Sequence, residues 1–421
     1  MKNKSMLIKQ IDMSFVSILA AFLCVSVLVS SCGETEPEIS DDVSTTEITD
    51  FAGRQLVYLL DEMDAAIEQN PTGRRGPKVS VRSVRDDELF LVSSRDWVSG
   101  FLPGILWYMY ELTGEDFWLE EARKRTAPIE REKTNDGTHD MGFKIYCSFG
   151  NGYRLTGDPH YRDVIVESAQ TLITRYNETV GAIRSWDFNR ETWDFPVIVD
   201  NMMNLELLFR ASEITGDPIY HDIAVQHART TMEHIFRDDN SSYHVIDFDT
   251  TTGEVRHRHT HQGEFHESAW ARGQAWGLYG YAMSYRFTQL PEFLEQAEKI
   301  AAFMLNHPRL PNDLVPYWDF DAENIPSEPR DVSAAAITAS ALYELSTMVS
   351  ENSDYYKQTA DQMLAGMYRN YGSEPGENLG FLLGHSTGNR PGGYEVATPI
   401  IYAEYYFLEA ALRKQRLEES S

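Results

Sequence analysis

The chain has 421 residues, of which 65 are acidic and 37 are basic, so its net charge at pH 7 is −28. So acidic a protein argues against nucleic acid, and against an anionic membrane face, as the binding partner. Three cysteines cannot build a disulfide framework, so a hydrophobic core has to stabilise the fold.

The first 31 residues have the layout of a secretory signal peptide. A lysine-containing start precedes an apolar run over residues 13–29 and the small residues Val29-Ser30-Ser31. Together with Cys32 these resemble a bacterial lipobox, which predicts lipidation of Cys32; the alternative is an ordinary signal peptide cut nearby. The acidic stretch 32–47 then predicts a tether. We expect the protein to be lipid-anchored in the cell envelope, periplasmic or cell-surface, and to meet the membrane through this anchor alone.

One sequence motif recurs where predicted helices meet. Its copies span residues 110–118, 153–161 and 212–220, each centred on Thr-Gly followed by acidic residues. The glycine can adopt the left-handed conformation that closes a helix. The aspartate can cap the next helix, whose first position suits Pro159 or Pro218. Each copy therefore predicts a joint between two stacked helices. The residues concerned are Gly114, Gly157, Gly216, Asp116, Asp158 and Asp217.

Twelve segments follow the 3.6-residue period of an α-helix. Segments after the joints are amphipathic, whereas others, such as 332–345, are apolar nearly all round, which predicts an outer ring of helices on an inner ring. Six such pairs predict an all-α fold, an (α/α)6 barrel, as one catalytic domain over 48–421. An open α-solenoid is the alternative, but the repeat spacing varies too much for one. The predicted helices are 52–70, 99–113, 116–130, 141–156, 158–177, 199–215, 217–237, 270–288, 291–307, 332–351, 353–371 and 394–414.

Four motifs bring unusual residues to the predicted mouths of the inner helices. They are Arg95-Asp96-Trp97-Val98-Ser99-Gly100, His139-Asp140-Met141-Gly142-Phe143, Asp200-Asn201-Met202-Met203-Asn204 and Trp270-Ala271-Arg272-Gly273-Gln274-Ala275-Trp276-Gly277.

Asp140 and Asp200 each lie at the predicted start of an inner helix. For a lone aspartate, plain helix capping is the better explanation. Two of them at neighbouring helix mouths instead predict the carboxylate pair that sugar hydrolysis requires. A helix start favours the ionised form, while a second carboxylate raises one pKa, so that one of the two can hold a proton.

In this order, the motifs resemble the unsaturated glucuronyl hydrolases of glycoside hydrolase family 88, over nearly the whole mature chain. The resemblance implies removal of the unsaturated (Δ4,5) hexuronic acid from the non-reducing end of lyase-generated glycosaminoglycan oligosaccharides, with no cofactor and no metal. It implies that Asp200 is the catalytic proton donor and water-activating base. Asp140 would position the sugar ring and tune Asp200.

The resemblance also places binding residues around the uronate. His244, Gln262, Arg272 and Trp276 are expected to surround its ring, together with His139 and His261. Arg272 can grip a carboxylate through two parallel hydrogen bonds. Among the tryptophans, we assign Trp97, Trp186 and Trp276 to sugar stacking, and Trp107 and Trp118 to the core.

Segment 256–266 is the densest cluster of arginine and histidine, and we expect it to supply the positive charge that an acidic substrate needs. A zinc site at His259, His261 and His266 is an alternative, but the spacing matches no strong zinc signature; a solvated loop without a role is another. In the last inter-helix loop, Gly388 stands where the family has a hydroxyl that reads sulfate, and Arg390 stands near its lysine. Arg390 is a candidate sulfate or carboxylate ligand, or one partner of a surface salt bridge.

Three other functions stay open. An unsaturated rhamnogalacturonyl hydrolase would act on pectin fragments, an (α/α)-barrel epimerase would depend on histidines, and a glycan-binding lipoprotein would not be catalytic. The expected partner is an acidic di- to tetrasaccharide, and the sequence does not specify the oligomeric state.

Overall fold

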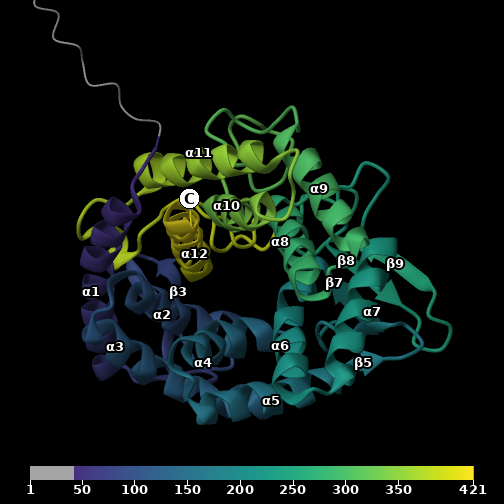
Figure 1. Ribbon diagram of the computed structural model, residues 1–421, viewed down its shortest axis with the longest axis horizontal. Helices are drawn as coiled ribbons and strands as arrows, with labels where there is room; N and C mark the ends of the chain where they lie inside the picture. The colour runs from purple at the N-terminus through teal and green to yellow at the C-terminus, as the bar shows by residue number, and fades with distance from the viewer. Residues whose placement is uncertain (1–41, 421) are drawn as a thin grey trace, which may run out of the picture. The chain divides into compact units, whose positions relative to one another are not determined.

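The computed structural model describes residues 42–420, which form two concentric layers of helices (Figure 1). The inner helices are α2 (Phe101–Thr113), α4 (Asn151–Thr156), α6 (Leu205–Thr215), α8 (Ala271–Thr288), α10 (Val332–Ser346) and α12 (Ile401–Ser420). The outer helices are α1 (Thr45–Gln69), α3 (Asp116–Thr126), α5 (Pro159–Ile173), α7 (Pro218–His234), α9 (Pro291–Leu305) and α11 (Ser353–Tyr371).

The inner ring is closed. Helix α2 packs on α4, α6 on α8, α8 on α10, α10 on α12 and α12 on α2, and the segment 142–150 that leads into α4 packs on α6. The ring of described helices therefore has no open end. The composition of the helices explains the layering, because every residue of α10 is buried whereas α3 and α5 bury one face only. The chain therefore forms the predicted (α/α)6 barrel, and the open solenoid is wrong.

The Thr-Gly joints behave largely as predicted. Gly114, Gly157 and Gly216 all take positive φ, at 70°, 67° and 73°, and each closes its helix. The side chains of Asp158 and Asp217 accept hydrogen bonds from backbone N–H groups of the helices they precede. The prediction for Asp116 is wrong: α3 begins at Asp116 itself, and its side chain caps nothing.

A buried polar network joins the inner helices across the barrel. The carboxylate of Glu409 on α12 accepts hydrogen bonds from Tyr108 on α2 at 2.8 Å and from Tyr279 on α8 at 3.0 Å. Its other oxygen accepts one from Ser340 on α10 at 2.6 Å. One side chain thus ties four helices together, and the cationic Arg413 lies 3.6 Å from the same carboxylate.

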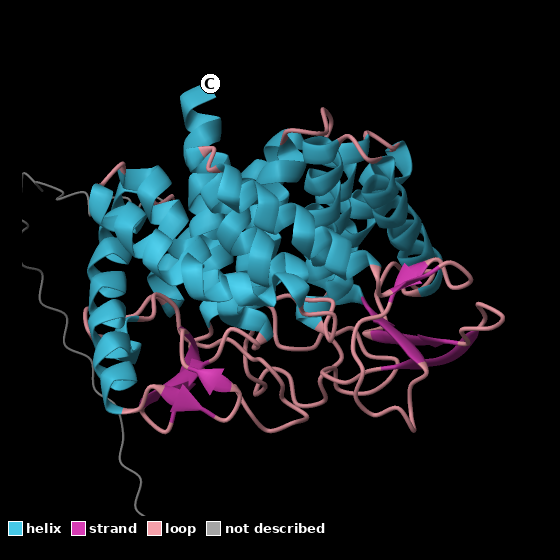
Figure 2. Ribbon diagram, turned by 90° about the horizontal axis from the view of Figure 1, so that it is seen from below, coloured by secondary structure: helices cyan, strands magenta, loops and turns pink. Residues whose placement is uncertain are grey.

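Short strands and long loops gather at one end of the helices (Figure 2). The sequence predicted none of these strands, because pairs of two to six residues depend on tertiary contacts for their stability. They pair as β1–β2, β3–β4, β5–β6 and β7–β8–β9, all antiparallel. Their bounds are β1 (Thr72–Gly73), β2 (Gly76–Pro77), β3 (Ser80–Arg85), β4 (Glu88–Val92), β5 (Tyr176–Asn177), β6 (Ala182–Ile183), β7 (Phe195–Ile198), β8 (Val245–Phe248) and β9 (Val255–His259).

Helix ends differ from prediction where local chemistry sets them. Helix α1 starts at Thr45 rather than at residue 52, because Ser44 and Glu47 form a reciprocal capping box. Helix α12 starts at Ile401 rather than at residue 394. Pro399 disfavours helical geometry in the residue before it, so the preceding residues join the last loop.

Three inner helices are entered through irregular turns where regular helix was predicted. They are the 3-10 turn η1 (Trp97–Gly100) before α2, the π-helix η3 (Gly142–Gly150) before α4, and the 3-10 turn η4 (Val199–Asn204) before α6. Such turns are found at functional sites more often than elsewhere.

The predicted signal peptide, Cys32 and most of the predicted tether lie outside the described residues. Within residues 42–420, no helix is long and apolar enough to cross a bilayer. Cys147 is buried as a free thiol.

Candidate active site

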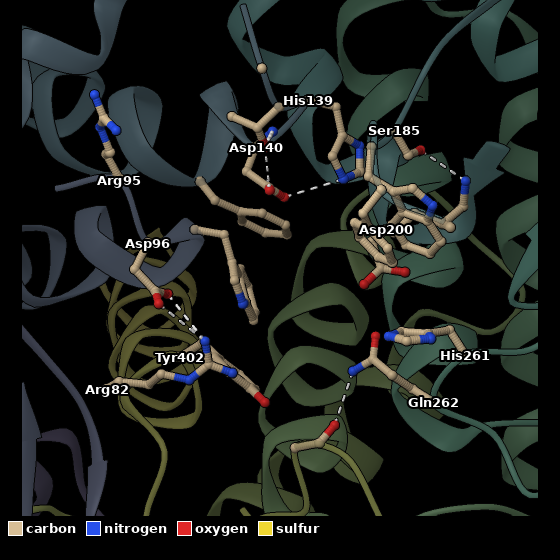
Figure 3. Close-up of a pocket in the computed structure, with 18 of the residues that line it drawn as sticks. Arg82, Arg95, Asp96, His139, Asp140, Ser185, Asp200, His261, Gln262 and Tyr402 are labelled. Carbon is tan, nitrogen blue, oxygen red and sulfur yellow. Dashed lines mark hydrogen bonds and ion pairs between the residues drawn. The ribbon is translucent and has the colours of Figure 1, made fainter. Parts of the chain in front are cut away.

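A cavity of about 620 Å³ opens at the loop end of the inner helices, within the size range of small-molecule sites. It brings together eight of the predicted site residues from distant parts of the chain (Figure 3). These are Trp97, His139, Asp140, Trp186, Asp200, His261, Gln262 and Arg272.

Asp140 lies just before η3, and its side chain points into the cavity rather than capping the helix. Thr138 Oγ1 donates a hydrogen bond to Asp140 Oδ2 at 2.6 Å, which fixes the carboxylate. His139 Nε2 lies 3.3 Å from the other oxygen, Oδ1. Burial lowers the pKa of His139, so the imidazole is neutral at pH 7 and leaves the negative charge of Asp140 in place.

Asp200 lies in the first turn of η4 and is 9% exposed. Burial raises the pKa of Asp200 from 3.8 to about 7, and the neighbouring charge of Asp140 adds to the rise. The guanidinium of Arg272 and the indole of Trp276 act in the opposite direction. Within residues 42–420, Asp200 Oδ2 has no hydrogen-bond partner. The result is a carboxyl group that can hold a proton near neutral pH and release it.

The irregular starts η3 and η4 are packed directly on each other. Gly142 has no side chain, and a Cβ there would come within 2.6 Å of the Asn204 Cα. The backbone N–H of Phe143 donates to Asn204 Oδ1 at 3.1 Å. These contacts hold the two segments that carry Asp140 and Asp200 at a fixed spacing.

His244 lies behind the cavity wall and supports the loop that reaches into it. It is 3% exposed, and burial lowers its pKa well below the ordinary value, so the ring is neutral. Its Nδ1 accepts hydrogen bonds from the backbone N–H groups of His261 and Gln262, at 3.0 and 3.1 Å. Its Nε2 lies 3.8 Å from Asp200 Oδ2. His244 therefore positions the loop and does not line the cavity.

Arg272 lines the cavity but is held firmly by protein groups. Its Nη1 donates to Asp331 Oδ2 at 2.7 Å and to the carbonyl of Thr387, and its Nη2 donates to the carbonyl of Gly388 at 2.5 Å. Three of the five guanidinium N–H donors are thus committed, which leaves two for a ligand. Because both Nη atoms already donate to protein groups, Arg272 cannot bind a carboxylate through its two Nη atoms at once.

A second arginine in the cavity, Arg82 on β3, connects segments that are 313 residues apart in the sequence. It forms a two-bond pair with Glu395, at 2.5 and 2.8 Å, and a further bond to Asp96 at 3.2 Å. Burial alone would raise the pKa of Glu395, but the hydrogen bonds and the charge of Arg82 lower it below its ordinary value. Glu395 in turn presses on Gly388, where a Cβ would lie 2.5 Å from Glu395 Oε2. A side chain at residue 388 is therefore excluded by packing.

Aromatic side chains line two sides of the cavity. Trp97 packs against Tyr402, with ring centroids 5.0 Å apart. Trp186 stacks on Phe188, with centroids 4.8 Å apart and planes at 24°. Phe188 is 46% exposed at the mouth, which leaves a face free for a sugar. No sequence motif pointed to Phe188 or Tyr402.

Besides His244, two further residues predicted to contact the substrate lie outside the cavity lining. Trp276 is fully buried against Phe143 and Tyr406 and does not line the cavity, so it has no face for stacking. Arg390 is 47% exposed, lies 3.7 Å from Glu328 and is also outside the cavity lining. Its distance to Glu328 agrees with the salt-bridge alternative. Trp107 and Trp118 lie in the core, as predicted.

The positive charge comes from a different place than predicted. Arg256, His257 and Arg258 lie exposed on β9, away from the cavity, and Arg256 pairs with Asp247 at 3.2 Å. From that segment, only His261 and Gln262 line the cavity. Its cations are instead Arg75, Arg82, Arg95 and Arg272. Composition located a basic segment, but the fold decides which face of it meets the site.

The zinc alternative finds no support in the described residues. His259 and His266 stack with their ring centroids 4.5 Å apart, and Thr260 N donates to His266 Nδ1. Across residues 42–420, no group of three or more His, Cys, Asp or Glu side chains is arranged to hold a metal ion.

Comparison with known proteins identifies the relatives of this chain. The family model described as Glycosyl Hydrolase Family 88 matches residues 79–412. An unsaturated glucuronyl hydrolase from Formosa agariphila is 54% identical over 337 residues, which cover 80% of this chain and 84% of that protein.

Solved structures agree. The crystal structure of an unsaturated glucuronyl hydrolase specific for heparin superposes with a TM-score of 0.83 at 45% identity, covering 89% of this chain and 99% of that one. A variant of the Streptococcus agalactiae unsaturated glucuronyl hydrolase, solved with dGlcA-GalNAc6S, has a TM-score of 0.73 at 28% identity and covers 89% and 92%.

Proposed function

The chain belongs to glycosyl hydrolase family 88, and from this premise we propose that it removes the unsaturated uronic acid from the non-reducing end of lyase-generated glycosaminoglycan oligosaccharides, with Asp200 as its proton donor. The observation that carries the assignment of Asp200 is its burial in the cavity, which raises its pKa to about 7. An ordinary surface aspartate would be ionised at that pH and could not donate.

The substrate has a C4=C5 double bond conjugated to the ring oxygen, which is an enol ether. Asp200 gives its proton to C4, and positive charge develops at C5 and the ring oxygen. Water then adds to C5 and returns a proton to the Asp200 carboxylate. The resulting hemiketal opens at the C5–O5 bond, and the hemiacetal left at C1 expels the partner sugar. One water is consumed, and no covalent bond forms between sugar and enzyme.

Asp140 has a supporting role in this scheme. Its carboxylate is fixed by Thr138, and a carboxylate charge at that place stabilises the cationic centre that forms on protonation. The same charge keeps the pKa of Asp200 high. Asp140 thereby favours both the protonated acid before the step and the charge that the step creates.

Binding of the uronate uses the remaining groups of the cavity. Trp97 and Trp186 provide apolar faces for the pyranose ring. Gln262 is held by its bond to the Gly388 carbonyl at 3.0 Å, and its Oε1 is left for a sugar hydroxyl. Arg272 contributes its charge and its two uncommitted N–H donors to the substrate carboxylate.

We also propose that the enzyme acts at the cell envelope, held there by a lipid on Cys32. The support is the lysine-containing start, the apolar run and the Val-Ser-Ser-Cys sequence at residues 29–32. Metabolic labelling with a fatty-acid probe, compared between wild type and Cys32→Ala, tests this. Labelling that persists in the variant contradicts it.

The substrate class is tested by assaying lyase products from heparin, chondroitin and pectin side by side. Hydration of the double bond removes its absorbance at 235 nm, and mass spectrometry identifies the released sugar. We expect turnover of the glycosaminoglycan products. Turnover of the pectin products alone would favour the rhamnogalacturonyl alternative, and binding without turnover would favour a glycan-binding protein.

A further inference from the structure

Four arginines line the cavity, and two of them have no partner in the described chain. Arg82 is bound by Glu395 and Asp96, and Arg272 by Asp331 and two carbonyls. In contrast, the side chains of Arg75 and Arg95 make no ion pair or hydrogen bond with any residue in 42–420. Both are exposed and both line the cavity.

The two unpaired arginines come from neighbouring segments. Arg75 is the second residue of the two-residue turn between β1 and β2, whose partners are Gly73 and Gly76. A Cβ at Gly76 would lie 4.0 Å from the Ser93 Cβ, so the tip of this hairpin rests on the segment that leads to Arg95.

Two hydrogen bonds fix the backbone at Arg95. Its carbonyl accepts a hydrogen bond from the buried Lys144 at 2.9 Å, and the N–H of Asp96 donates to the Ser93 carbonyl at 3.0 Å. Figure 3 places Arg95 on the opposite side of the cavity from Asp200 and His261. Arg95 thus lies on the rim opposite the catalytic wall, and the contact of Gly76 with Ser93 places the hairpin tip that carries Arg75 next to the segment of Arg95.

Carboxylates that line the same cavity do not neutralise them. Asp96 and Glu395 bind Arg82, and Asp187 pairs with Arg175 at 2.8 Å. Two like charges on adjacent segments repel each other, and an anion between them removes that cost. In a chain of net charge −28, such a positive rim is a local exception that needs an explanation.

We propose that Arg75 and Arg95 together bind a sulfate ester on the leaving sugar, so that the enzyme prefers sulfated substrates. This inference rests on the proposed function. A uronate that reacts at the buried Asp200 occupies the floor of the cavity, so groups at the exposed rim meet the next sugar. The amino sugar that follows uronate in glycosaminoglycans carries no carboxylate, and its anionic groups are sulfates. Guanidinium groups match sulfate as they match phosphate, through paired N–H donors.

The test uses Arg75→Gln and Arg95→Gln, with Arg74→Gln as the matched control. Arg74 is the other residue of the same turn and is exposed, but it does not line the cavity. Each protein is assayed at 235 nm on two unsaturated disaccharides that differ only in sulfation of the leaving sugar. The pair is taken from whichever glycosaminoglycan series the wild type hydrolyses faster.

We expect Arg75→Gln and Arg95→Gln each to lower kcat/KM for the sulfated disaccharide roughly tenfold, chiefly by raising KM. The unsulfated disaccharide should change less than about twofold, and Arg74→Gln should match the wild type on both. Equal losses on both substrates would mean that the arginines hold the uronate itself, and the inference would be wrong. It would also be wrong if neither variant changed either substrate. In both of those cases, hydrolysis by the wild type would leave the proposed function standing.

Discussion

Gly142 lies against the backbone of Asn204 so closely that a single added carbon would come within 2.6 Å of the Asn204 Cα. This contact joins η3 to η4, and these two turns carry or directly follow the two aspartates of the site. The spacing of the carboxylates is therefore set by a glycine that takes no part in the chemistry.

Gly142→Ala should lower both stability and activity. The added methyl group has to push the two turns apart, and overpacking of this kind costs about 1–3 kcal/mol. Because catalysis is sensitive to small displacements, we expect kcat to fall at least tenfold as well. Thermal unfolding and the 235 nm assay measure the two effects.

Gly53→Ala is the matched control for that variant. Gly53 lies in the outer helix α1, where a Cβ would meet its nearest neighbours at an ordinary 3.9 Å. Alanine is the better helix former by about 1 kcal/mol, so this variant should be slightly stabilised and fully active. Equal behaviour of the two variants would show that the Gly142 contact has no special importance.

The pH dependence should report Asp200 directly. A proton donor works only while protonated, and burial raises the pKa of Asp200 to about 7. We therefore expect kcat/KM to fall about tenfold per pH unit above pH 7 and to level off below it. A profile that stays flat to pH 9 would exclude Asp200 as the acid.

Asp140→Asn should shift the fall of kcat/KM with rising pH to a lower pH. The charge of Asp140 is one of the causes that raise the pKa of Asp200, and the amide removes that charge without changing the shape. Residual activity, or the carboxyl carbon resonance of Asp200 in NMR, follows the shift. If the fall of kcat/KM moved to a higher pH instead, Asp140 would not raise the pKa of Asp200.

The sequence predicted that Asp140 and Asp200 meet in one cavity, because each aspartate stands in its own contiguous motif at the start of an inner helix. It could not predict the cavity wall. Arg75 reaches the site from a hairpin of two-residue strands, and Glu395 reaches it through Arg82, more than 300 residues away. Local pattern carries no information about such contacts.

The mistaken assignments share one physical cause. Segment 256–266 is rich in arginine and histidine, but β9 exposes Arg256, His257 and Arg258 to solvent and none of the three lines the cavity. Trp276 was assigned by its motif, yet α8 is buried on all sides and leaves that indole fully enclosed. In both cases the residue type suited the predicted contact, but the sequence did not show which way the side chain points.

His244→Phe should weaken substrate binding through the loop that His244 supports. The substitution leaves the N–H groups of His261 and Gln262 without their acceptor, which costs about 1–3 kcal/mol in stability. We expect KM to rise more than kcat falls. His244→Asn, whose amide oxygen can replace Nδ1, should restore most of the loss; if it does not, the loop is held by other contacts.

Phe188→Ala should raise KM about threefold to tenfold, because it removes the stacking face at the cavity mouth. Phe117→Ala is the matched control, since Phe117 is also 46% exposed but lies on the outer helix α3. Similar KM values for the two variants would show that Phe188 does not touch the substrate.

The most direct test of the central claim compares wild type with Asp200→Asn in the 235 nm assay at pH 6, with circular dichroism to verify the helices. The amide keeps the shape of the side chain but cannot donate and accept the proton. We predict that kcat falls at least a hundredfold while the fold is unchanged. Hydrolysis at the wild-type rate would contradict the account.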